Sequence, residues 1–246
     1  MPYLNSVPFF RGLPLAERYE LTDCVPRELG VKAAAGEVVA GPLPLADYLR
    51  LESTFERLGP FGIAVRGRAR SALLFSRKPV RQLDGATIAV TEQSSTNDCL
   101  LRLLLEQRYE LKSLQYRRGQ PDEADALLLI GDEALQAHHT NTCYPFEIDV
   151  AFEWWLWQHL PFVFAVWGIR RDADADVKKE VEVGVIKALA MNTPRFAAIA
   201  EDYAKRLALP EAELQIYLSS FVYRLSQSEE EAIERFKALA NEHHLL

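Results

Sequence analysis

A run of hydroxyl, amide and carboxyl side chains occupies residues 91–98, in the order Thr-Glu-Gln-Ser-Ser-Thr-Asn-Asp. It follows a short apolar stretch and precedes a leucine-rich helical pattern, so it is a strand-to-helix corner. Unpaired N–H groups and the helix dipole at such a corner favour a carboxylate or phosphate, and Ser94, Ser95 and Thr96 add donors. The alternative is that Ser95 and Asp98 form a capping box and satisfy those donors themselves. The motif alone leaves both interpretations open.

Two other short segments could contribute polar groups. Asn5 lies between Leu4 and Ser6, just ahead of a proline, in a stretch with turn chemistry, and taken alone it is a turn residue. Gly131 and Asp132 end an apolar strand, where open α/β sheets place ligand contacts. The same pair is also an ordinary way to leave a strand and begin a helix, and that reading is slightly favoured.

Several conspicuous patterns have simpler interpretations. The aromatic run 153–157 could wall a pocket, but aromatic stripes more often belong to a core. The adjacent pairs His138-His139 and His243-His244 point their side chains apart in polar surroundings, so we expect surface residues. The sequence carries no glycine-rich nucleotide motif and no metal-binding motif. We therefore expect neither a metal site nor a cofactor.

The elements that position these groups follow an α/β order. Short apolar runs alternate with helical patterns through the first two thirds, which predicts a largely parallel sheet. From Asp174 the pattern turns helical, with a further short strand at Phe221–Leu225 and a capping box for the last helix at Ser226/Glu229 or Ser228/Glu231. The strongest strand candidates are Ser71–Ser76, Ala86–Thr91, Ala124–Ile130 and Phe162–Ile169.

This order suits two discontinuous lobes with a cleft between them. We expect lobe one to contain residues 1–77 plus 162–246, and the inserted lobe two to contain residues 78–161. The crossing strands would be Ser71–Ser76 and Phe162–Ile169.

Composition narrows the class of protein. The net charge of −7 argues against a surface that binds nucleic acid. Three widely spaced cysteines indicate a reducing compartment, and the sequence shows no secretory signal and no apolar run long enough to span a bilayer. We expect a cytoplasmic protein with a small-molecule partner, and neither a nucleic-acid nor a membrane partner.

Five sequence blocks, taken together and in order, resemble one family. They are Tyr3–Phe9, Ser71–Ser76, Ser94–Thr96, Leu128–Leu135 and Leu160–Trp167, and the tail around Phe221-Val222-Tyr223 is similar too. The family is chorismate dehydratase of the futalosine route to menaquinone. The resemblance implies an α/β fold like the type II periplasmic binding proteins, with discontinuous domains and a helical C-terminal tail.

The resemblance also implies a reaction and a site. The family removes water from chorismate to give 3-[(1-carboxyvinyl)oxy]benzoate without a metal or organic cofactor. It implies that Asn5 is the catalytic residue, orienting the substrate or its leaving hydroxyl, and that a substrate carboxylate serves as the base. The substrate-binding residues would be Ser71, Ser95, Thr96, Asn97 and Gly131.

The chain departs from the family pattern at three places. Members carry a short strand and a serine ahead of the Tyr-Leu-Asn motif, an Asp near the position of Val39, and a small hydroxyl residue where this chain has Asn97. Two other functions remain as alternatives. One is 1,4-dihydroxy-6-naphthoate synthase of the same pathway, and the other is a non-catalytic protein that binds a small anion.

Overall fold

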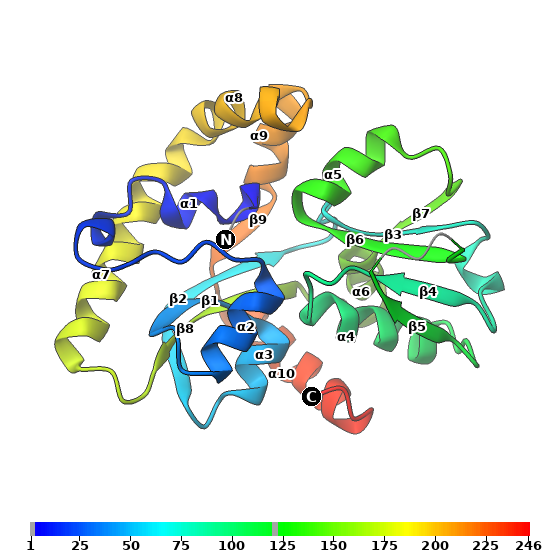
Figure 1. Cartoon of the computed structure of the whole chain (residues 1–246), viewed down its shortest axis with the longest axis horizontal. Helices are drawn as coiled ribbons and strands as arrows, with labels where there is room; N and C mark the ends of the chain where they lie inside the picture. The colour runs from blue at the N-terminus through cyan, green and yellow to red at the C-terminus, as the bar shows by residue number, and fades with distance from the viewer. Residues whose placement is uncertain (1–2, 120–122) are drawn as a thin grey trace.

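The protein forms two lobes, each built around its own β-sheet (Figure 1). The structure is a computed structural model and describes residues 3–119 and 123–246. The first and last thirds of the chain build the first lobe, on the left of Figure 1, while the middle of the chain, drawn in green, builds the second. The two-lobed α/β fold with a helical tail is therefore the one the sequence predicts.

The first sheet has four strands in the order β1-β8-β2-β9, and all its described pairs are antiparallel. β8 lies at the centre and pairs with β1 on one side and β2 on the other. β1 is an edge strand, because β8 is the only strand that pairs with it among the described residues. The strands are β1 (Ala40–Pro44), β2 (Phe55–Val65), β8 (Phe162–Arg170) and β9 (Phe221–Arg224).

The second sheet has five strands in the order β5-β4-β6-β3-β7. β4 pairs in parallel with β5 and β6, whereas β3 runs antiparallel to β6 and β7. The strands are β3 (Ala72–Ser76), β4 (Thr87–Val90), β5 (Gln115–Arg118), β6 (Ala126–Ile130) and β7 (Phe146–Asp149).

The prediction of a largely parallel sheet is wrong, because only the two pairs that β4 makes are parallel. Two neighbouring parallel strands must be joined by a crossover connection that carries the chain back to the end of the sheet where the first strand began. Strands β3, β7 and β8 instead lie where the chain passes between the two sheets, and they run against their neighbours. β3 also belongs to the second sheet, although the sequence predicts that residues 72–76 are part of lobe one.

The helices cover both faces of each sheet. On one face of the first sheet lie α1, α7, α8 and α9, and α10 lies low in Figure 1, beneath both lobes. The helices and helical turns are η1 (Leu4–Ser6), α1 (Val7–Phe10), η2 (Pro14–Glu17), α2 (Pro26–Ala34), α3 (Leu45–Arg50), η3 (Val80–Gln82), α4 (Thr96–Arg102), the π-helical η4 (Leu103–Arg108), α5 (Gly131–Thr140), α6 (Val150–Gln158), α7 (Ala175–Asn192), η5 (Thr193–Arg195), α8 (Phe196–Leu207), α9 (Glu211–Ser219) and α10 (Gln227–Glu242).

One apolar core continues from the first sheet into the second. It joins Val65 and Phe162 of the first sheet to Leu74 and Leu128 of the second, and α10 contributes Phe236. A separate core fills the space between the first sheet and helices α1, α7, α8 and α9. The two lobes are therefore packed together through one shared apolar core.

The aromatic run at the end of the second lobe belongs mainly to this core, as expected. Trp154 is fully buried, its indole N–H donates to the Pro161 carbonyl at 2.9 Å, and its ring meets those of Phe162 and Phe236 edge-on. The predicted capping box at Ser226 and Glu229 is also present at the start of α10.

Candidate active site

The strand-to-helix corner after β4 is capped differently from either sequence interpretation. The Ser94 hydroxyl accepts the backbone N–H and the side-chain amide of Asn97, each at 3.1 Å. Ser95 is the N-cap residue but makes no side-chain cap, and Asp98 pairs with Arg102 and Arg118 instead. The Ser95–Asp98 capping box is therefore absent. The Asn97 side-chain oxygen is buried and has no hydrogen-bond partner among the described residues.

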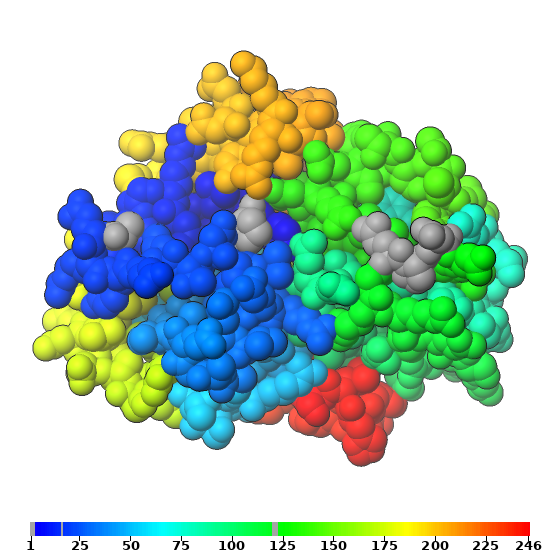
Figure 2. All heavy atoms as spheres, viewed as in Figure 1, coloured from blue at the N-terminus to red at the C-terminus, as the bar shows by residue number. Residues whose placement is uncertain are grey.

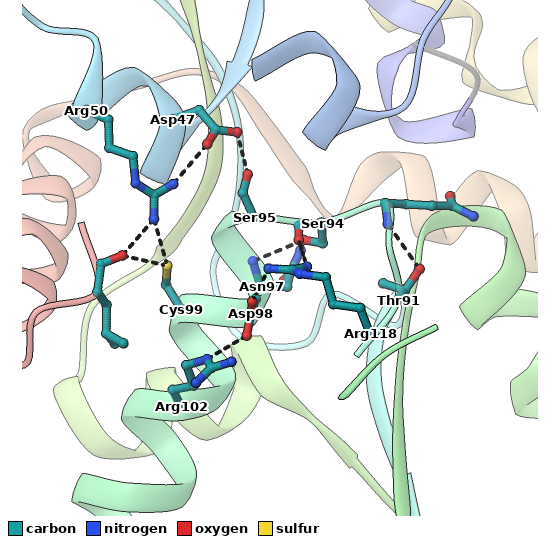
Figure 3. A network of polar contacts seen from close by, with 12 residues as sticks. Asp47, Arg50, Thr91, Ser94, Ser95, Asn97, Asp98, Cys99, Arg102 and Arg118 are labelled. Carbon is teal, nitrogen blue, oxygen red and sulfur yellow. Dashed lines mark hydrogen bonds and ion pairs between the residues drawn. The ribbon is translucent and has the colours of Figure 1, made fainter. Parts of the chain in front are cut away.

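Ser95 and Thr96 bind the first lobe. The Ser95 hydroxyl donates to the Asp47 carboxylate at 2.5 Å (Figure 3). The Thr96 hydroxyl accepts the backbone N–H of Ala46 at 3.1 Å. Burial raises the pKa of the Asp47 carboxyl, while the bond from Ser95 and the nearby Arg50 act to lower it. Two hydroxyls that the sequence assigned to a ligand therefore hold the lobes together in this conformation.

Asn5 lies in the turn η1, and the second lobe fixes this turn. The Leu4 backbone N–H donates to the Asp132 carboxylate at 2.9 Å, and Arg206 approaches the other oxygen of that carboxylate at 3.5 Å. Burial is the main cause that raises the pKa of Asp132. The side-chain oxygen of Asn5, like that of Asn97, is buried without a partner among the described residues.

Gly131 allows the chain to pass close to the ring of Tyr3. Its φ of +62° lies in the left-handed region, and a Cβ at this position would come within 2.6 Å of the Tyr3 ring. The Gly131 N–H donates to the Ser71 carbonyl at 2.8 Å, and the Tyr3 hydroxyl donates to the side chain of Gln93. The Gly131-Asp132 pair at the end of β6 thus begins α5, and it also bounds the cleft. The helix-start interpretation and the ligand-contact interpretation each describe part of its role.

A small cavity of about 50 Å³ lies between the two sheets where these groups meet. Five of the six predicted site residues line it, namely Asn5, Ser71, Thr96, Asn97 and Gly131. Ser95 does not line it, and Ser94 does. The other lining residues are Tyr3, Pro26, Pro44, Ile63, Ser94, Ile130, Phe164 and Ala165.

Tyr3 and Ser94 also line the cavity, although the family resemblance assigns neither of them to the site. Ser94 is one of the three corner hydroxyls expected to add donors, whereas a tyrosine in a turn does not by itself indicate a cavity wall. Ligand pockets usually measure about 300–1,000 Å³, so this cleft is closed too tightly to hold a small molecule of ordinary size.

Contacts across the cleft explain why it is closed. On the face seen in Figure 2, blue atoms of the first lobe lie directly against green atoms of the second. Besides the bonds already described, the Arg27 N–H donates to the Gln93 carbonyl at 3.0 Å, Gln136 donates to the Leu207 carbonyl at 3.1 Å, and His139 pairs with Glu213 at 2.8 Å. All these bonds are polar, and Ala46, which donates to Thr96, also belongs to the continuous apolar core.

A second, larger cavity of about 520 Å³ lies within the first lobe. It follows the outer edge of β1 and the extended residues 20–24, and apolar side chains such as Phe10, Leu29 and Val181 line it. Trp167 also lines it, and its indole N–H has no partner among the described residues. None of the predicted site residues reaches this cavity.

Known structures identify the class of fold. A protein of Archaeoglobus fulgidus superposes with a TM-score of 0.77 at 19% identity, covering 100% of this chain and 96% of its own. The alkanesulfonate-binding protein SsuA of Xanthomonas axonopodis pv. citri superposes with a TM-score of 0.66 at 15% identity, covering 99% and 90%. The chain therefore has the two-lobed fold of the periplasmic binding proteins.

Sequence comparison identifies the family. A family model described as menaquinone biosynthesis matches residues 1–242. The chorismate dehydratase of Thermus thermophilus is 32% identical over 251 residues, which cover 95% of this chain and 91% of that protein. The chain belongs to the menaquinone biosynthesis family.

Metal-ligating residues do not gather anywhere in the described parts of the chain. Within residues 3–119 and 123–246, no three His, Cys, Asp or Glu side chains are placed to hold an ion together. Within the same residues, no helix is long and apolar enough to cross a membrane.

Proposed function

We propose that this protein is a chorismate dehydratase, a carbon–oxygen lyase that converts chorismate to 3-[(1-carboxyvinyl)oxy]benzoate in menaquinone biosynthesis. The observation that carries the proposal is the pair of buried amide oxygens without described partners, on Asn5 and Asn97, in the cleft of a family member. Buried polar groups are normally paired, so two oxygens without described partners, on two residues that line one cavity, favour a ligand there. The Thermus thermophilus relative carries the name of this activity.

The chemistry suits such a cleft because it needs positioning more than a strong base. The C–O bond to the ring hydroxyl breaks, and a ring carbon loses its proton. The electron pair of that C–H bond completes the aromatic ring, and the hydroxyl leaves as water. Aromatisation supplies the driving force, and the reaction is redox-neutral, so it requires no cofactor. The protein must hold a dianion, exclude water and direct the leaving hydroxyl.

The side chains divide this work. Asn5 would orient the leaving hydroxyl, and a carboxylate of the substrate would take the ring proton. Ser71, Thr96, Asn97 and the Gly131 segment would bind the carboxylates. Ser95 would join them once its bond to Asp47 opens. We add Ser94, because it lines the cavity and its hydroxyl accepts two hydrogen bonds from Asn97.

Substrate entry requires the cleft to open. A cavity of about 50 Å³ is several times smaller than usual ligand sites. The polar contacts across the cleft would break, while the continuous core and α10 would keep the two lobes together. We propose that the lobes move as units around the two sheets, with residues 66–71 and 159–161 as the connections. We also place the enzyme in the cytoplasm, which agrees with three unpaired cysteines.

Mass spectrometry of chorismate incubated with the purified protein tests the activity. We expect a product lighter by one water to accumulate relative to a sample without enzyme, and Asn5→Ala protein to produce much less. Chorismate that persists unchanged while it binds to the protein would overturn the proposal. That outcome would favour a non-catalytic anion-binding protein, which the fold shared with SsuA also accommodates.

A further inference from the structure

A fully buried tyrosine outside the cleft touches one of the proposed substrate-binding serines. Tyr217 belongs to α9 in the tail of the first lobe and has no exposed surface. Its hydroxyl donates to the Ser71 hydroxyl oxygen at 2.9 Å, and its ring packs edge-on against Phe221 with the ring centres 5.0 Å apart. Burial raises the pKa of Tyr217 well above its usual value, so the phenol keeps its proton.

This contact decides what the Ser71 hydroxyl offers to the cleft. A serine hydroxyl can donate one hydrogen bond and accept others, and it rotates to suit its neighbours. The Tyr217 proton occupies an acceptor position on the oxygen. The hydrogen of Ser71 then has one described protein acceptor, the Ala69 carbonyl, at a distance of 3.5 Å. That distance is at the limit for a hydrogen bond, so the hydrogen is free to turn towards the cavity that Ser71 lines.

We propose that Tyr217 is a positioning residue that fixes Ser71 as a hydrogen-bond donor to a carboxylate of the ligand. The inference deepens the proposed function and rests on it for the identity of the ligand. The chain of bonds runs from the phenol to the serine and from the serine to the carboxylate. Each bond polarises the next, and the final acceptor is charged, which makes the terminal bond the strongest of the chain.

The arrangement also predicts which ligands the cleft rejects. A ligand that presents a hydrogen-bond donor to Ser71 would force the serine to accept a second proton and would leave its own hydrogen poorly placed. An amide, through its N–H₂ group, can meet Ser71 in this unfavourable way, whereas a carboxylate cannot. Ser71 and Tyr217 should therefore favour an acid over the corresponding amide.

Tyr217→Phe tests the proposal, since it removes one hydroxyl from a closely similar side chain. We expect the KM for chorismate to rise about threefold to tenfold, which is the usual scale of one hydrogen bond, with kcat changed less than KM. Tyr223→Phe is the matched control, because Tyr223 is also buried but its hydroxyl has no partner among the described residues. Its KM should remain within twofold of the wild type.

A double-mutant cycle separates positioning from a general structural role. In the Ser71→Ala background, Tyr217→Phe should change KM by less than twofold, because the hydroxyl that it positions is gone. An equal rise in KM with and without Ser71, or no rise in the single variant, would overturn the proposal. Thermal unfolding of each variant shows whether it is folded.

A second measurement needs no tyrosine variant and no turnover. Binding of benzoate and benzamide to the wild type should favour the acid, and Ser71→Ala should reduce that preference at least threefold. An unchanged preference would overturn the proposal even if Tyr217→Phe did not fold. If chorismate is not dehydrated but benzoate binding depends on Ser71 and Tyr217, the proposed function fails while this inference stands. If chorismate is dehydrated and the preference is unchanged, only the inference fails.

Discussion

The cavity within the first lobe and the cleft between the sheets differ in almost every respect. The cavity within the first lobe is about ten times larger, at about 520 Å³ against 50 Å³, and has mainly apolar walls. The cleft between the sheets is small, but both of its asparagines present a buried oxygen without a described partner. Several of its other polar side chains bridge the lobes. The larger cavity has one such orphaned group, the indole N–H of Trp167.

The difference teaches that size is a poor guide to function in a protein that closes. A cleft between moving lobes is smallest when its walls meet, whereas a cavity within one lobe keeps its volume. Buried polar groups without hydrogen-bond partners destabilise the protein when no ligand is bound. They therefore indicate where a ligand could supply the missing hydrogen bonds. The comparison predicts that changes in the small cleft alter activity and that changes in the large cavity do not.

Asn5→Ala should have the largest effect. The substitution removes the amide that would meet the leaving hydroxyl, and groups that stabilise a transition state are worth about 100-fold or more in rate. We expect kcat to fall by that factor with a smaller change in KM, measured with chorismate under steady-state conditions. If the variant turned over chorismate as fast as the wild type, the cleft around Asn5 would not be the site of the reaction.

Gly131→Ala should lower the stability of the protein. The new Cβ would collide with the Tyr3 ring at 2.6 Å, and the φ of +62° disfavours any L side chain. Overpacking and backbone strain together cost about 2–4 kcal/mol. Thermal or urea unfolding measures the loss, and a stability close to that of the wild type would show that Tyr3 is free to move.

Ser94→Ala and Ser95→Ala form a pair that distinguishes the cavity wall from the contact between lobes. Ser94 lines the cavity and holds Asn97, so its loss should raise KM about tenfold, as expected for a hydrogen bond that serves a charged ligand. Ser95 meets Asp47 and lies outside the lining, so its loss should raise KM less. The reverse order would show that the open cleft uses the hydroxyls differently.

Gly41→Ala should have the smallest effect and is the control for the larger cavity. Gly41 lines that cavity, and a Cβ there would meet Leu29 at an ordinary distance of 3.6 Å. We expect unchanged kcat and KM and a stability within about 1 kcal/mol of the wild type. A loss of activity in a well-folded variant would break the comparison, because it would give the larger cavity a role in the reaction.

Much of the architecture could be predicted from the sequence because the central strands are short, apolar and bounded by turns. The ends of β3, β4, β6, β8 and β9 all lie within two residues of their predicted positions. β1 and β2 were not predicted, since Pro42, Pro44, Gly59 and Pro60 interrupt their patterns. The relative directions of neighbouring strands could not be predicted from the sequence, because they depend on how the chain crosses between the two sheets.

The site was predictable as a set of segments but not as a set of contacts. Hydroxyl residues at a strand-to-helix corner indicate an anion site, and the family resemblance added Asn5. Ser94 and Ser95 are neighbours of the same residue type, and the direction of each side chain depends on the turn, so only the structure shows that Ser94 faces the cavity. Tyr217 lies 146 positions from Ser71, and no local pattern connects them.

The bond between Ser95 and Asp47 has a consequence for how tightly any ligand can be held. A ligand that needs the open cleft must first displace a hydrogen bond that the protein makes with itself, so the measured affinity is the result of an exchange. If the open form is about 1% of the population, the apparent Kd is weaker than the intrinsic one by roughly 100-fold. Asp47→Ala would remove one competitor for Ser95, and the same contacts with the ligand would then give tighter binding.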